Sequence, residues 1–244
     1  MNIFFASSEA EGADTESYDP RTDPGISENY GIEDSARGKA ACKRALREAF
    51  GLKEGSLPII GIAAPFEKDN GIELLMPVAD MLLEGGFQLA VAGEGDEFCE
   101  LFFTGLSLRR PGDAGVLICD YREHEREIYA GSDVFLPLDH WRLVGGGHLA
   151  AMHYGAIPIV FAPRGDADAA SGRGSVSGGG FAFCRYEPSS MFDACMRAFS
   201  IYLLEDCWRG LVRCAMSCDS GWAACAEKYM GLYVQVAGMG GAER

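Results

Sequence analysis

Three observations in the sequence predict a doubly wound, Rossmann-like α/β fold with a parallel sheet. Short apolar segments recur from residue 57 onward, longer helical stretches separate them, and loops rich in glycine or charge follow them. Segments that are apolar throughout are typical of parallel strands covered on both faces. The chain has 244 residues, which is long enough to bury such a sheet under helices on both sides.

The predicted strands and helices alternate along the chain. Six strands are expected at 57–65, 87–95, 114–121, 133–138, 156–163 and 181–186. The helices between them are expected at 71–84, 97–109, 122–131 and 146–154, and the stretch 188–236 reads as helices only. In such a sheet, ligands bind at the carboxyl ends of the strands. The loops after the first, second, fourth and fifth strands are therefore the candidate site.

Composition excludes several classes of function. The net charge of −15 argues against a nucleic-acid partner, and no apolar run is long enough to span a bilayer. The first ten residues lack the basic and long apolar regions of a signal peptide, so we expect a cytoplasmic chain without a membrane partner.

The nine cysteines are odd in number and scattered, as expected of small buried hydrophobes in a reducing compartment. Cys207, Cys214, Cys218 and Cys225 gather late in the sequence but form no C-x-x-C pair. We therefore predict neither a zinc site nor a cofactor.

A glycine-rich loop is the strongest candidate for an anion site. In LPLDHWRLVGGGHLAAMHYG, residues 136–155, Gly145, Gly146 and Gly147 lead into a predicted helix. Unpaired backbone N–H groups and the helix dipole can hold a phosphate at such a place. Arg142 would then be a further charge partner for the anion. The alternative is a loop without a ligand, in which Arg142 faces solvent or pairs with Asp139.

A second glycine loop, GEGDE at 93–97, is a weaker signal, because a G-x-G with Gly93 and Gly95 also suits a tight strand–helix turn. Several other polar residues are interpreted as structural. We expect His153 to be a surface or packing residue, and Asp166 and Asp168 to cap the chain locally. The charged run REHERE, 122–127, is expected to be a solvated helix face with i,i+4 charge pairs, and Asp133 to be structural.

Several segments follow one another between about residue 12 and 236: GADTESYDPRTDPGISENY, KAACKRALREAFGL, AVAGEGD, EIYAGSDVFL, LAAMHYGAIPIV, GGGFAF, and a closing D-x-x-W…A-x-x-Y of Asp219, Trp222, Ala226 and Tyr229. Their order and spacing resemble the C-terminal domain of bacterial glycogen synthases and plant starch synthases. The resemblance implies one half of a GT-B glycosyltransferase, which is built from two facing Rossmann-like domains. It also implies a helix over 39–52, ADP-glucose as donor held mainly by this domain, and glucan held largely by the other.

The sequence departs from the family at the positions that carry the chemistry. Pro65 and Asn70 stand where the family loop R-L-x-x-Q-K-G has the Arg and Lys that neutralise the donor diphosphate. Lys68 is nearby but two positions early. Arg142 stands where the family has a Glu that supports charge at the anomeric carbon. A guanidinium there opposes an oxocarbenium-like transition state, so we expect no intact catalytic residue.

The remaining positions suit binding rather than transfer. The residues expected to contact the nucleotide or its diphosphate are Gly145, Gly146, Gly147, His148, Lys68, Gly93 and Gly95. The expected ligand is ADP or ADP-glucose.

The expected organisation follows from the same resemblance. Residues 1–11 resemble a remnant of the family's first strand, 12–56 the inter-domain segment and first helix, 57–236 the Rossmann-like domain, and 237–244 a tail. The rest of the N-terminal domain is missing between Ala10 and Gly12 in this reading. An interaction subunit docking on a partner such as an intact synthase, a relic without function, and a domain completed by a separate N-terminal chain are the alternatives.

Overall fold

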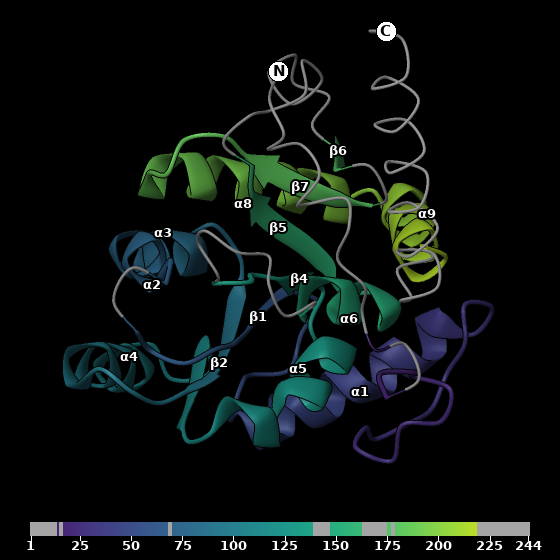
Figure 1. Cartoon of the computed structure of the whole chain (residues 1–244), viewed down its shortest axis with the longest axis horizontal. Helices are drawn as coiled ribbons and strands as arrows, with labels where there is room; N and C mark the ends of the chain where they lie inside the picture. Colours follow the sequence, from purple (N-terminus) through teal and green to yellow (C-terminus); the bar gives the residue numbers. More distant parts are fainter. Residues whose placement is uncertain are drawn as a thin grey trace, which may run out of the picture.

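The computed structural model describes residues 14, 17–67, 70–138, 147–162, 175–176 and 179–218. Within that part of the chain no helix is long and apolar enough to cross a membrane. The described residues form one α/β body with helices on either side of a sheet (Figure 1).

The sheet has seven strands in the order β3-β2-β1-β4-β5-β7-β6. Six of them run parallel, and only the two-residue β6 pairs antiparallel, with β7. Their bounds are β1 Ile59–Ala63, β2 Gln88–Gly93, β3 Ala114–Ile118, β4 Val134–Phe135, β5 Ile157–Phe161, β6 Ser175–Val176 and β7 Gly180–Phe183. The six strands predicted from the apolar segments are all present, so the predicted parallel sheet is confirmed.

Helices cover both faces of the sheet, as the doubly wound class requires. One face carries α2 (Ile72–Leu75), the 3₁₀ turn η2 (Met76–Val78), α3 (Ala79–Glu84), α4 (Glu97–Arg109) and α8 (Pro188–Tyr202). The other carries α5 (Glu125–Gly131) and α6 (Gly147–His153), with α1 (Ser35–Ala49) packed on α5 and α9 (Glu205–Met216) on α6 (Figure 1). A 3₁₀ turn, η3 (Tyr121–Glu123), precedes α5.

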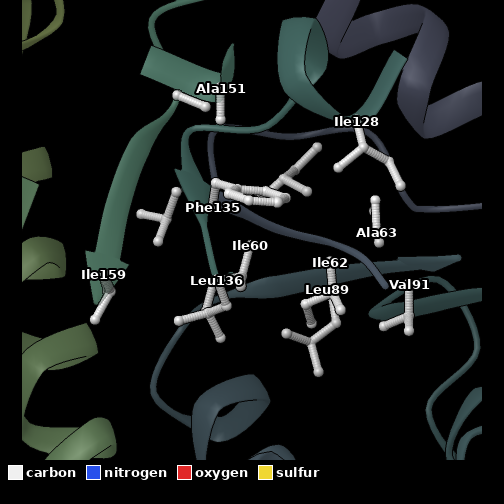
Figure 2. Close-up of a cluster of buried hydrophobic side chains, with 14 of the residues drawn as sticks. Ile60, Ile62, Ala63, Leu89, Val91, Ile128, Phe135, Leu136, Ala151 and Ile159 are labelled. Atoms are coloured by element: carbon white, nitrogen blue, oxygen red, sulfur yellow. The ribbon is translucent and has the colours of Figure 1, made fainter. Parts of the chain in front are cut away.

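The central strands are buried on both faces, which explains their unbroken apolar sequence. Every residue of β1 and β2 is buried. Figure 2 shows Ile62 of β1 beside Leu89 of β2, and Ile128 of α5 above Ala63. Gly61 lets α5 approach, because a Cβ there would lie 2.6 Å from Cγ2 of Ile128.

Two helices differ from their predicted form for local reasons. The stretch predicted as one helix over 71–84 is divided into α2, η2 and α3, with Pro77 in the first turn of η2. Proline has no N–H to donate to the preceding turn, so a continuous α-helix is interrupted there. The helix predicted at 122–131 begins at Glu125, because Asp120 caps the separate turn η3 through the backbone N–H of Arg122, at 3.1 Å.

The prediction of a solvated charged face at 122–127 was wrong for two residues. The carboxylate of Glu125 accepts a hydrogen bond of 2.5 Å from the Tyr18 hydroxyl. Arg126 pairs with buried Asp23 at 2.9 Å and donates to the carbonyl of Ser17. This run therefore attaches the segment 17–30 to the domain instead of facing only water.

Buried polar contacts with Tyr154, the residue after α6, also hold the segment 17–30 in place. The Tyr154 hydroxyl donates to Asp23, and the Tyr30 hydroxyl donates to the carbonyl of Tyr154 at 2.8 Å.

Lys39 on α1 donates to the carbonyls of Ala130, Ser132 and Tyr154 at 2.9–3.0 Å. Burial lowers the pKa of Lys39 to about 8.

Candidate functional site

The candidate site lies at the carboxyl ends of β1 and β4, where the strand order reverses direction. The chain leaves β1 toward α2 on one face of the sheet and leaves β4 toward α6 on the other. Crevices at such switch points bind ligands in doubly wound folds. The two loops meet there: Gly71 has φ +85, and a Cβ on it would lie 3.4 Å from the carbonyl oxygen of Leu138.

The loop after β1 is closed by its own amide side chain. Asn70 donates from Nδ2 to the carbonyl of Pro65 at 3.2 Å, and the N–H of Glu67 donates to the same carbonyl at 3.1 Å. The Asn70 amide is thus used within the loop. Lys68 lies outside the described residues.

Gly93 and Gly95 allow the loop after β2 to pack against the loop after β1. A Cβ at Gly93 would lie 2.2 Å from the carbonyl oxygen of Ala64, and one at Gly95, where φ is +149, would lie 2.5 Å from that of Phe66. Phe66 is fully buried and exchanges backbone hydrogen bonds with Glu94 and Asp96. Only glycine fits both positions, so close backbone packing accounts for them.

The chain's own carboxylates occupy the N-terminus of α4. Asp96 accepts hydrogen bonds from the N–H groups of Phe98 and Cys99, at 3.0 and 3.3 Å. Glu100 accepts one from the N–H of Gly95 at 2.8 Å. These are donors that a phosphate would otherwise use, and the two negative charges would repel it.

At the start of α6 the described residues are Gly147 and His148. A Cβ on Gly147 would lie 3.2 Å from the Tyr129 hydroxyl. Burial lowers the pKa of His148 from 6.5 to about 4, so its imidazole is neutral near pH 7. It can offer an N–H to an anion but no full charge. Arg142, Gly145 and Gly146, and with them the rest of the predicted cradle, lie outside the described residues.

Beside this crevice lies a small apolar cavity between α2, β4, β5, β7 and α8. Its volume is about 20 Å³, which holds about one water molecule and no sugar or nucleotide. Tyr186 lines it and donates a hydrogen bond of 2.5 Å to Oε1 of Glu73. The other carboxylate oxygen of Glu73 is buried with no hydrogen-bond partner in the described part of the chain.

Polar residues interpreted as structural lie away from the crevice. Asp133 is buried, accepts from the N–H of Ile59 at 2.8 Å and pairs with Lys43 at 2.6 Å, which confirms its structural role. His153 lies in the last turn of α6; the pKa of the nearby Asp19 carboxyl is lowered mainly by the side-chain hydrogen bond from Arg21, and the His153 charge adds to this. Asp166 and Asp168 lie outside the described residues.

The described residues contain no group of three or more His, Cys, Asp or Glu side chains that could hold a metal ion. Of the late cysteines, Cys207 and Cys214 are exposed free thiols, and Cys225 lies outside the described part.

Sequence reasoning missed the polar network that involves Asp23, Tyr30, Lys39, Arg126 and Tyr154. The partners that these side chains bind across the domain are 91 or more residues apart along the chain, so no local pattern identifies them. The only signal was the unusual density of tyrosine and aspartate between residues 14 and 30.

Comparisons with known proteins identify the class. No protein-family model matches the chain. It is 33% identical over 225 residues to the glycogen synthase of Geotalea uraniireducens (strain Rf4), and 34% identical over 225 residues to that of Anoxybacillus flavithermus (strain DSM 21510 / WK1). Each alignment covers 91% of this chain and 46% of the relative. The chain thus spans about half the length of the curated relatives it matches.

Solved structures of glycosyltransferases also match the fold of the chain. The catalytic domain of starch synthase IV from Arabidopsis thaliana, bound to ADP and acarbose, matches with a TM-score of 0.77 and 28% identity over 92% of this chain and 48% of that one. The C-terminal domain of a group 1 glycosyl transferase, LpcC, from Francisella tularensis shares the fold alone, with a TM-score of 0.54 and 14% identity over 89% of this chain and 98% of that domain.

The fold, with its topological switch point between β1 and β4, is that of one Rossmann-like half of a GT-B glycosyltransferase. Within that class, the chain resembles the C-terminal domain of glycogen and starch synthases.

Proposed function

We propose that this chain is a glycogen synthase-like domain that binds ADP or ADP-glucose but does not transfer glucose by itself. The observation that carries the proposal is the hydrogen bond from Asn70 to the carbonyl of Pro65. It lies at the two positions where the family has the cations that hold the donor diphosphate. Losing one such group commonly costs on the order of 10²-fold in rate.

The charge at Arg142 supports the same conclusion. A guanidinium at the family's glutamate position raises the energy of a positively charged transition state, although it attracts a diphosphate. Binding and transfer are therefore affected in opposite directions by this one residue. The similar starch synthase IV structure, which is bound to ADP, supports a nucleotide as the ligand.

The proposed contacts are at the loops that meet in the crevice. Gly145, Gly146 and Gly147 present backbone N–H groups, Arg142 and Lys68 supply positive charge, and the neutral His148 donates a hydrogen bond. The role of Gly93 and Gly95 is indirect, because they pack the neighbouring loop into place. We place this domain in the cytoplasm, in keeping with its free thiols.

Titration calorimetry with ADP and then with ADP-glucose tests binding. We expect micromolar affinity that Arg142→Glu weakens about tenfold, the loss of one charge-assisted contact. The control is Lys53→Glu, which makes the same charge change at an exposed position before β1, at the amino edge of the sheet. No binding by a folded sample, or equal weakening by both variants, overturns the nucleotide site.

Incorporation of labelled glucose from ADP-glucose into glycogen tests the catalytic half of the proposal separately. We expect none above background. Measurable incorporation by the pure chain would show that the altered loops still support transfer. If neither ligand binds, the remaining hypotheses are an interaction subunit and a relic without function. A stable complex recovered with an intact synthase would favour the interaction subunit.

A further inference from the structure

Helix α4 carries two apolar stripes, and in the described part of the chain only one of them is buried. Cys99, Phe103 and Leu106 are buried against the sheet. On the opposite side, Phe98, Leu101 and Leu108 are 71%, 66% and 78% exposed. With Gly105 between them, these positions are three, four and three residues apart, which places them in one row along the helix.

A continuous row of exposed apolar side chains indicates an interaction site, which scattered apolar residues do not. Single exposed leucines are normal on soluble proteins, whereas contiguous apolar surface marks an interaction site. Helix α4 lies at the periphery of the molecule (Figure 1), where it packs on β3, the edge strand of the sheet. A partner can therefore reach the row from outside without entering the crevice at β1 and β4.

Gly105 gives an independent reason to expect a closely packed partner. A glycine inside a helix costs about 0.5–1 kcal/mol relative to alanine. The described part of the fold does not require it, since a Cβ at this position would meet only the flexible end of Arg109 there, at 3.1 Å. Glycine does allow the backbone of a second helix to approach closely between Leu101 and Leu108.

The row is complementary to itself when two helices run antiparallel. A two-fold axis near Gly105 sets Leu101 of one chain against Leu108 of the other, twice, with the two glycines at the crossing. Glu97 at the acidic end of each helix then lies toward the basic end of the other, which holds Arg109. A parallel pair would bring like charges together at both ends, so the charges favour the antiparallel arrangement.

We propose that this row, Phe98, Leu101, Gly105 and Leu108, is the contact surface of an antiparallel, two-fold dimer of this chain. A membrane surface fits less well, because interfacial helices pair their apolar face with a basic one and this chain has a net charge of −15. Three large side chains per chain bury less than the roughly 1,200 Å² of a standard interface, so the dimer is weak. The proposal does not depend on nucleotide binding.

Sedimentation velocity of the 244-residue chain, from about 1 to about 200 μM at physiological salt, tests association. We expect a concentration-dependent dimer that Leu101→Glu weakens at least tenfold. Leu203→Glu is the matched control: Leu203 is also 66% exposed but lies between α8 and α9. A monomer at every concentration overturns the proposal, and so does an equal effect of the two variants.

Cross-linking tests the orientation. Under mild oxidation, a mixture of Leu101→Cys and Leu108→Cys chains should give a disulfide between positions 101 and 108, identified by peptide mass. Neither variant alone should link to itself through the new cysteine. A 101–101 disulfide would show a parallel pair, and no link between the new cysteines in a confirmed dimer would place the interface elsewhere; either result overturns the arrangement. Peptide mapping also separates these links from those of the native thiols.

Discussion

At the scale of single residues, buried polar groups hold together segments that are distant in the sequence. Asp133 accepts from the backbone of β1 and pairs with Lys43 on α1. Lys39 satisfies three carbonyls at the ends of α5 and α6. Buried groups with all their partners present stabilise one arrangement, and removal of one partner leaves the others unsatisfied.

Substitution of Asp23, in the segment 17–30, should therefore cause a large loss of stability. It is 3% exposed and receives hydrogen bonds or charge from Gly25, Arg126 and Tyr154. Asp23→Ala leaves the Arg126 charge and the Tyr154 hydroxyl without this partner, and we expect a loss of about 3–5 kcal/mol in the free energy of unfolding. Urea denaturation measures it.

The matched control for Asp23→Ala is Arg21→Ala. It breaks the pair with Asp19, in which the Arg21 side chain is 73% exposed, so it should cost at most about 1 kcal/mol. Equal losses in the two variants would show that the Asp23 network contributes no more than a surface pair.

His148 should make stability depend on pH. Its pKa falls from 6.5 to about 4 on folding, because burial disfavours the charged ring. The unfolded chain therefore binds more protons between these values, and the stability associated with the neutral ring is present above about pH 6.5 and lost as the pH falls toward 4. The loss is at most about 3 kcal/mol.

Denaturation curves at several pH values between those limits compare wild type with His148→Gln. The variant should lose less stability over this range, because glutamine does not titrate, while the carboxylates contribute equally to both. Identical slopes would show that His148 is accessible to water when folded.

At the scale of elements, backbone contacts at two glycines hold two loops against each other. The loop after β1 and the loop after β2 touch through backbone atoms of Ala64, Phe66, Gly93 and Gly95. Any side chain at either glycine displaces the loop that borders the crevice. This packing is also why the G-x-G motif alone is a poor indicator of phosphate binding here.

Gly93→Ala should destabilise the fold by about 2–4 kcal/mol, because its Cβ would lie 2.2 Å from a backbone oxygen that cannot move freely. Gly210→Ala in α9 is the control, since no described residue lies within 4 Å of a Cβ at that position, and it should stabilise by about 0.5–1 kcal/mol. Thermal unfolding of both variants measures the difference. A Gly93→Ala variant as stable as wild type would mean that the loops separate without cost.

Element prediction succeeded where the local sequence determines the element. Helix α4 begins and ends as predicted, because Asp96 caps it and one apolar row faces the sheet. Prediction failed where distant contacts decide: β6 has only two residues and exists through pairing with β7, and Glu125 and Arg126 bind a segment about 100 residues away. The sequence predicted the candidate site at the loops after the first, second, fourth and fifth strands, but the hydrogen bond from Asn70 to Pro65 depends on the backbone path of the first of these loops.

At the scale of the whole molecule, the net charge of −15 opposes the compact state. The repulsion is long-ranged in dilute buffer, where the screening length is about 30 Å, and short-ranged at physiological salt, where it is about 8 Å. Salt should therefore stabilise the folded chain, even though it weakens individual ion pairs. The exposed pairs are worth little, so the collective term should prevail.

We expect the thermal midpoint to rise by about 2–4 °C from 10 mM to 150 mM sodium chloride at pH 7.5, which corresponds to roughly 1 kcal/mol for a chain of this size. Scanning calorimetry at low micromolar concentration, where the proposed dimer is dissociated, measures the midpoint.

Near pH 5.5 the carboxylates begin to titrate and the net charge falls toward zero, which it reaches at the isoelectric point of about 4.6, so the same addition of salt should have a smaller effect. A midpoint that falls with salt at pH 7.5 would mean that specific ion pairs, such as Arg126 with Asp23 and Lys43 with Asp133, outweigh the net repulsion.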